Sequence, residues 1–106
     1  MRVWVNGTFD VVHIGHIRLL EFASKYGDVT VGIDSDDRIK SKKGLSRPFN
    51  KLNERLEFLK SIRYIKDVVS FATDDELVER IKSFQPDFMV IGDDYKDRSE
   101  EHTSEL

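Results

Sequence analysis

The sequence predicts an α/β protein with a Rossmann-like open parallel sheet and flanking helices. Short β-rich apolar segments alternate along the 106 residues with longer segments whose apolar residues have helical spacing. This alternation is typical of βαβ units with right-handed crossovers, and the length allows one hydrophobic core. The polar and glycine-containing motifs follow the expected strands, and open parallel sheets bind ligands at the carboxyl ends of their strands.

The first expected strand and helix occupy the beginning of the chain. Residues Arg2–Asn6 (RVWVN) are short, apolar and β-rich, and Gly7 ends them. Gly27 fits the C-cap of a helix in which three residues share helical spacing, namely Leu19, Ala23 and Tyr26. A strand followed directly by a helix opens a βαβ unit.

The middle of the chain continues this pattern. Residues Asp28–Asp34 (DVTVGID) predict a second, largely buried strand. The polar and basic segment 35–50 contains a glycine and a proline and predicts a long loop or a weak helix. Asn50 can then cap a helix whose apolar side is formed by Leu52, Leu56, Leu59 and Ile62.

Two more strands and one helix follow. Residues Asp67–Phe71 predict the third strand, and Thr73–Glu76 (TDDE) fit a capping box. The fourth strand is expected at Asp87–Gly92. The helix between them should end before Pro86 and bury Leu77, Ile81 and Phe84.

The composition excludes several classes of protein. The net charge is −3, so no excess of positive charge indicates nucleic acid or an anionic membrane as a partner. There is no cysteine, which excludes disulfides and thiolate metal sites. No apolar run approaches the ~20 residues of a membrane helix, and the start of the chain has no signal-peptide pattern. We therefore expect a cytoplasmic location.

Two of the three histidines, His13 and His16, lie at the first change from strand to helix (GTFDVVHIGH). Free N–H groups and the positive end of the dipole attract phosphate to a helix start, and a neutral imidazole can donate a hydrogen bond to it. Gly7 lets the backbone approach a ligand, and Gly15 begins the helix. A single histidine here is usually a cap or a packing residue, whereas the pair favours a grip on a reacting phosphate. Zinc is disfavoured because no third ligand has suitable spacing.

This motif resembles the GTFDxxHxGH signature of the cytidylyltransferase-like branch of the HIGH nucleotidyltransferase superfamily. The similarity runs through residues 1–97 and includes segments 47–69 and 91–95. The resemblance implies an enzyme that joins a nucleoside triphosphate to a phosphorylated alcohol or sugar and releases pyrophosphate. It also implies Mg²⁺ on the phosphates and, because such enzymes are often dimers, a homodimer.

The resemblance also assigns roles to individual residues. It implies catalysis by His13, His16 and Lys42, nucleotide binding by Gly7, Thr8, Phe9, Gly15 and Asp94, and substrate or phosphate binding by Asp10, Arg55 and Arg63. Several assignments have alternatives. Lys42 can be a solvated loop charge like Lys40 and Lys43, and Asp10 can bind Mg²⁺ or cap a turn. Arg55 and Arg63, eight residues apart on one expected helix, should share a face, but surface arginines are also common. Asp93 and Asp94 can be turn formers.

The C-terminal end departs from the family. An RTxGxSTT-like motif that follows GDDY in relatives is absent, and residues 98–106 (RSEEHTSEL) match the translation of a common sequencing adapter. We expect a nucleotidyltransferase domain at residues 1–97, a non-native tail at 98–106, a sheet incomplete at its C-terminal end, and weak or no turnover.

The nucleotide stays open between CTP and ATP. Residues 92–95 (GDDY) favour the glycerol-phosphate cytidylyltransferases, and residues 31–50 favour the heptose adenylyltransferases. CTP is placed first, with an ADP-heptose-type adenylyltransferase as the alternative, and an envelope or surface-polysaccharide precursor is the expected acceptor. Three rivals are an aminoacyl-tRNA synthetase fragment, a receiver-like signalling domain and a phosphate-binding module without turnover.

Overall fold

The computed structural model describes residues 1–91, which form four parallel strands and four helices. The order of the strands in the sheet is β3-β2-β1-β4. The elements are β1 (Arg2–Gly7), α1 (Ile14–Ser24), β2 (Asp28–Asp34), α2 (Asp36–Lys43), α3 (Leu52–Lys60), β3 (Asp67–Phe71), α4 (Asp74–Phe84) and β4 (Phe88–Ile91). The predicted α/β fold is confirmed.

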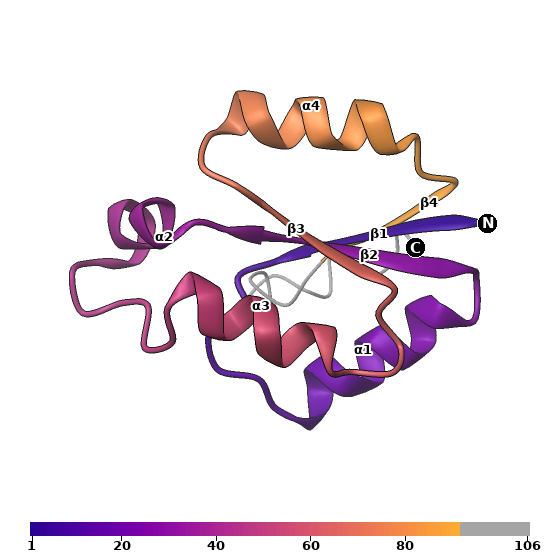
Figure 1. Cartoon of the computed structure of the whole chain (residues 1–106), viewed down its shortest axis with the longest axis horizontal. Helices are drawn as coiled ribbons and strands as arrows, with labels where there is room; N and C mark the ends of the chain where they lie inside the picture. The colour runs from indigo at the N-terminus through magenta and orange to yellow at the C-terminus, as the bar shows by residue number, and fades with distance from the viewer. Residues whose placement is uncertain (92–106) are drawn as a thin grey trace.

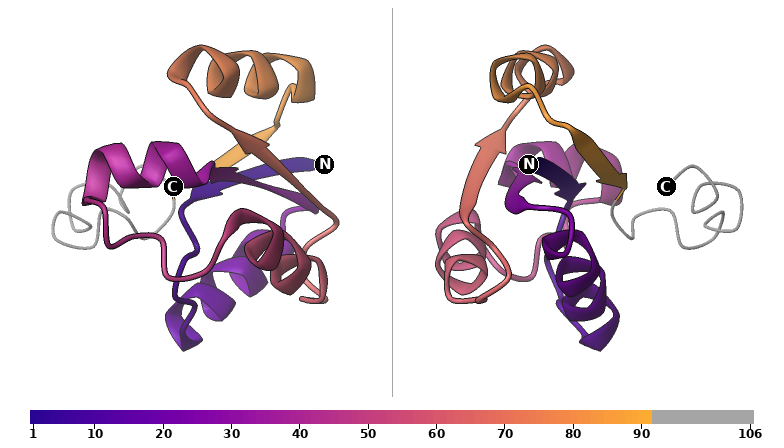
Figure 2. Two further views of the ribbon diagram at one scale, coloured as in Figure 1. Left: turned by 60° about the vertical axis from the view of Figure 1, so that its left-hand side comes forward. Right: turned by 90° about the vertical axis from the view of Figure 1, so that its right-hand side faces the viewer.

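The helices lie in layers around the sheet. Helices α1 and α3 cover one face, α4 covers the other, and α2 lies beyond the carboxyl end of β2 (Figures 1 and 2). The chain passes from β1 to β2 and β3, then returns to place β4 on the other side of β1. The strand order therefore reverses at β1, and the loop after β1 lies where open α/β sheets bind ligands.

A row of valines forms the centre of the core on the α1 and α3 side. Val5 is in register with Val31 and Val90, and Val31 is in register with Val68. All four are buried, as are Leu20 and Leu59 from the covering helices. Successive residues of a strand point to opposite faces. The residues that alternate with these valines therefore face α4. Each such side chain contributes about 1.5–3 kcal/mol on burial.

The α4 layer is thinner than the sequence predicts. Leu77, Ile81 and Phe84 are all only partly buried, and no residue of α4 is fully buried. The expectation that they are buried is wrong because no second helix packs beside α4 among residues 1–91. Trp4 is the large buried side chain below α4, with its ring 5.7 Å from that of Phe84.

Three expectations about helix ends need correction. The N-cap of α3 is Lys51 rather than Asn50, because Asn50 is engaged elsewhere, as described below. The C-cap of α1 is Lys25, and Gly27, with φ of +153°, instead allows the close approach of the Met1 carbonyl. Tyr26 is 43% exposed, since α1 ends before it and Leu20 fills the core.

Other expected boundaries are confirmed. The strands predicted at Asp28–Asp34 and Asp67–Phe71 have those bounds. Thr73 caps α4 by accepting a hydrogen bond from the Glu76 N–H, and the weak helix allowed in segment 35–50 is α2. No helix in the described part of the chain combines the length and the apolar composition needed to cross a bilayer.

Candidate active site at the start of helix α1

The two histidines lie in residues 8–16, which comprise the loop after β1 and the start of α1 and are called the histidine loop below. His13 is the N-cap of α1, and its Nδ1 accepts a hydrogen bond from the Gly15 N–H at 3.0 Å. The Nδ1 of His16 accepts from the His13 N–H at 3.0 Å. The ring centroids are 4.1 Å apart. The two imidazoles thus form a reciprocal cap and lie against each other.

This hydrogen-bond pattern assigns the tautomer of both rings. A nitrogen that accepts a hydrogen bond carries a lone pair, so each neutral imidazole has its proton on Nε2. His16 is 3% exposed and its ring is fixed against Phe9, with 5.2 Å between centroids, whereas His13 is exposed. The backbone therefore orients two Nε2–H donors at a helix start without adding a permanent charge.

Both glycines of the motif make room for these rings. A Cβ on Gly15 would lie 2.7 Å from Cε1 of His13, and a Cβ on Gly7 would lie 2.8 Å from Cε2 of Phe9. The sequence analysis predicted that Gly7 lets a ligand approach the backbone. In the structure Gly7 instead lies against the ring of Phe9, a residue with φ of +52°. Thr8 and Phe9 are both buried and so support the loop from within.

The N-terminus of α1 favours anions. No acidic residue lies in its first turn, whereas α2, α3 and α4 each carry at least one there. The positive end of the α1 dipole is therefore not compensated by a carboxylate of its own first turn. Together with the imidazoles, this end of α1 can bind a phosphate.

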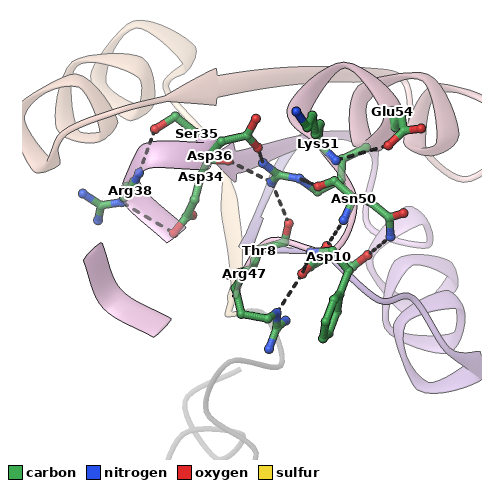
Figure 3. Close-up of polar contacts among 12 residues, drawn as sticks. Thr8, Asp10, Asp34, Ser35, Asp36, Arg38, Arg47, Asn50, Lys51 and Glu54 are labelled. Atoms are coloured by element: carbon green, nitrogen blue, oxygen red, sulfur yellow. Dashed lines mark hydrogen bonds and ion pairs between the residues drawn. The ribbon is translucent and has the colours of Figure 1, made fainter. Parts of the chain in front are cut away.

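Asp10 ties a distant segment to the histidine loop. Its carboxylate accepts hydrogen bonds from Arg47 Nε (2.9 Å), Phe49 N–H (2.8 Å) and Asn50 N–H (2.7 Å), and its carbonyl accepts one from the Asn50 side chain (Figure 3). We call these four residues the Asp10 clasp. The Asp10 side chain is 1% exposed. The sequence analysis predicted that Asp10 binds substrate or phosphate, binds Mg²⁺ or caps a turn. Its contacts in the structure are those of a cap, made to a segment far away in the sequence.

The clasp shifts the acidity of Asp10. Burial by itself raises the pKa of the Asp10 carboxyl, but the hydrogen bonds from Asn50, Phe49 and Arg47 together outweigh it and hold the pKa below its ordinary value. A carboxyl with a lowered folded-state pKa stabilises the protein at any pH above its unfolded pKa, about 3.9. That contribution is lost as the pH falls through the folded-state value.

We therefore expect the free energy of unfolding to fall as the pH drops below about 4. Asp10→Asn should remove part of this acid dependence and cost about 2 kcal/mol at pH 7, because hydrogen bonds to a buried charge are lost. Urea unfolding at several pH values measures both effects. The exposed Glu57 provides the control Glu57→Gln. Equal acid dependence in Asp10→Asn and the unsubstituted chain would contradict the role of the clasp.

Arg55 is turned inward rather than toward a ligand. Its side chain donates to the carbonyls of Thr8 (3.1 Å), Asp34 (2.8 Å) and Asn50 (3.0 Å), and to the Asp36 carboxylate at 2.7 Å (Figure 3). Arg55 is 2% exposed. It therefore joins the ends of β1 and β2 to α2 and to the clasp, and the predicted contact with phosphate does not fit this position.

The structure does not bring Arg63 and Lys42 to the histidines. Helix α3 ends at Lys60, so Arg63 lies outside it, and the expectation that it shares a helix face with Arg55 is wrong. Arg63 is exposed, donates to the Tyr64 hydroxyl, and lies near the amino end of β2. Lys42 is on the exposed last turn of α2. The hydrogen bond and charge of Arg38 lower the pKa of Asp74, and the charge of Lys42 adds to this effect. Asp94 lies outside the described residues.

Metal ligands do not cluster in the described part of the chain. Within residues 1–91, no three histidine or carboxylate side chains are placed to hold one ion. Of the carboxylates at this edge, Asp10 pairs with Arg47, Asp34 with Arg38, and Asp36 with Arg55. Each of these three carboxylates is therefore engaged by an arginine.

Sequence reasoning missed Arg47 as a site residue. The only signal was its place in the segment 47–69 of the family resemblance. Its contact with Asp10 spans 37 positions of the chain, which spacing alone does not reveal.

The sheet order reverses at β1, and the paired histidines stand at the helix start that follows it, where open α/β sheets bind ligands. This is the arrangement expected from the resemblance to the HIGH nucleotidyltransferases. The chain belongs to the cytidylyltransferase-like family, whose sequence model matches residues 4–106. It is 45% identical over 97 residues to the bifunctional protein HldE of Campylobacter jejuni subsp. doylei and 43% identical over 97 residues to that of Helicobacter hepaticus. These alignments cover 91% of this chain but only 20–21% of the relatives, so the chain spans about a fifth of their length.

A solved structure has the same fold. The lipopolysaccharide core biosynthesis protein from Thermoplasma volcanium GSS1 matches with a TM-score of 0.78. The match covers 99% of this chain and 84% of that chain, at 24% sequence identity. At this level of identity the likeness shows the fold alone.

Proposed function

We propose that this chain transfers an adenylyl group from ATP to a sugar phosphate and releases pyrophosphate, with a low turnover because the RTxGxSTT-like motif is absent. The observation that carries the proposal is the pair of oriented imidazoles, 4.1 Å apart, at a helix start without acidic residues. The relatives at 43–45% identity are HldE proteins, which favours the ADP-heptose-type alternative over the cytidylyltransferase that the sequence analysis placed first.

The proposed reaction is an in-line displacement at phosphorus. An oxygen of the acceptor phosphate attacks the α-phosphorus of the nucleotide, the bond from that phosphorus to the β-phosphate bridging oxygen breaks, and pyrophosphate leaves with the electron pair. Such reactions need positioning and neutralisation of charge more than covalent help from the protein. The Nε2–H groups of His13 and His16 would donate to phosphoryl oxygens whose charge grows in the transition state.

Magnesium is proposed as part of the nucleotide substrate. Mg²⁺ keeps several waters and is commonly bound through substrate phosphates and only one or two carboxylates. The engaged carboxylates of Asp10, Asp34 and Asp36 fit an ion that arrives with the triphosphate better than a resident one. A homodimer stays a prediction of the family resemblance.

The test separates nucleotide, acceptor and reaction. The purified chain is titrated with ATP and CTP by calorimetry, and pyrophosphate release is measured with each nucleotide plus mannose 1-phosphate or glycerol 3-phosphate. We expect tighter binding of ATP and release only when ATP and the sugar phosphate are both present. Preference for CTP with glycerol 3-phosphate would instead support the cytidylyltransferase that the sequence analysis placed first. Binding of ATP without any release would identify a phosphate-binding module instead.

A further inference from the structure

The guanidinium of Arg47 is anchored at one nitrogen beside the histidine loop. Its Nε donates to the buried Asp10 carboxylate at 2.9 Å, and its carbon lies 4.7 Å from the centre of the Phe49 ring. The Arg47 side chain is 29% exposed, so part of its guanidinium reaches solvent while Nε is held by Asp10. An anchored guanidinium loses little freedom on binding an anion, because it is already oriented.

The outer end of this guanidinium has unused donors. Neither Nη of Arg47 donates a hydrogen bond to a residue in the described range 1–91. Figure 3 shows this end pointing away from the clasp. Arg55, at the same edge of the sheet, donates hydrogen bonds from its side chain to three carbonyls and a carboxylate. Arg55 therefore supports the fold from a buried position, whereas Arg47 presents its Nη donors to solvent.

Through its contact with Asp10, Arg47 is attached to the same loop that carries the paired imidazoles. Asp10 precedes His13 by three residues, and three residues of chain span at most about 10 Å. The histidines supply donors without a permanent charge, as described above. A phosphate that carries one or two negative charges also needs a fixed cation, and two Nη groups match two of its oxygens.

We propose that Arg47 binds a phosphate group of one reactant and that Asp10 is the positioning residue that holds it. The inference rests on the proposed function, because that reaction brings two phosphorylated molecules to this edge of the sheet. The phosphate belongs either to the sugar phosphate or to the triphosphate, which share this chemistry. Separate titrations distinguish the two sources.

The experiment uses the full chain and three variants: Arg47→Gln, Arg47→Lys and Arg80→Gln. Arg80 is an exposed arginine of α4 whose Nε also donates to one protein oxygen, the Ser70 carbonyl at 3.1 Å, so it is a matched control on the other face of the sheet. Dissociation constants are measured by NMR titration with ATP and with mannose 1-phosphate, and melting temperatures are recorded for every variant.

We expect Arg47→Gln to raise the dissociation constant of one of the two probes about tenfold or more, because a charged hydrogen bond is lost. Arg47→Lys should recover part of that affinity because it keeps the charge, and Arg80→Gln should stay within twofold. Loss with mannose 1-phosphate assigns the acceptor phosphate, and loss with ATP assigns the triphosphate. Unchanged affinity in Arg47→Gln, or affinity that follows the melting temperature instead of the charge, would overturn the inference. If the unsubstituted chain binds neither probe, the proposed function fails as well.

Discussion

Replacing Arg55 with methionine is expected to lower the free energy of unfolding by about 3–5 kcal/mol, the usual cost of removing one member of a buried charged network. Methionine fills much of the same volume, but it leaves the carbonyls of Thr8, Asp34 and Asn50 without the donors that now satisfy them. Small domains are stable by only about 5–15 kcal/mol. The loss should therefore be plain in a urea unfolding curve followed by circular dichroism.

The control is Arg18→Met, because Arg18 is exposed on α1 and exposed substitutions usually change stability by less than about 0.5 kcal/mol. A loss of less than 1 kcal/mol in Arg55→Met would contradict the structural role. The opposite result, normal stability with weakened ATP binding, would support the contact with phosphate that the sequence predicted. The two measurements together decide which role Arg55 has.

The second large effect is expected at His16. Asparagine can place its side-chain oxygen where Nδ1 accepts from the His13 N–H, but it has no group in the place of Nε2. We expect His16→Asn to keep the cap and to lower pyrophosphate release about 10²–10³-fold, the usual cost of one donor to a developing charge. The assay uses ATP and the sugar phosphate, with the rate expressed as a ratio to the unsubstituted chain.

Glutamine provides the complementary variant. Its amide can reach the position of Nε2 but cannot also replace Nδ1, so His16→Gln should keep more activity than His16→Asn while disturbing the cap. If His16→Asn keeps more than a tenth of the original rate, Nε2 of His16 does not carry the reaction. If both variants lose the same activity and both melt early, the histidine serves mainly the helix start.

Local patterns predicted the elements of this fold well. The boundaries of β2 and β3, the Thr73 cap of α4 and the histidine pair at a helix start all depend on neighbouring residues. The failures share a different cause. The Arg55 and Arg63 argument assumed a helix that continues, but α3 ends at Lys60, and sequence spacing does not show where a helix stops.

The roles at the candidate site depend on long-range contacts. Whether Asp10 meets a metal or a backbone is decided by residues 47–50, which the fold brings back to it across 37 or more positions. The sequence selected Arg55 as a phosphate-binding residue, whereas in the structure its side chain is buried and hydrogen-bonded within the protein. Sequence spacing does not distinguish these two roles of an arginine. The clasp and the inward turn of Arg55 became visible only in three dimensions.

The thin α4 layer has a consequence for how this domain opens. Helix α4 contributes no fully buried side chain, while β1 and β2 are buried through most of their length. Segments with little buried apolar area separate from the rest at low free-energy cost. The amide hydrogens of α4 should then exchange with solvent through a partial opening that leaves β1, the histidine loop and α1 folded.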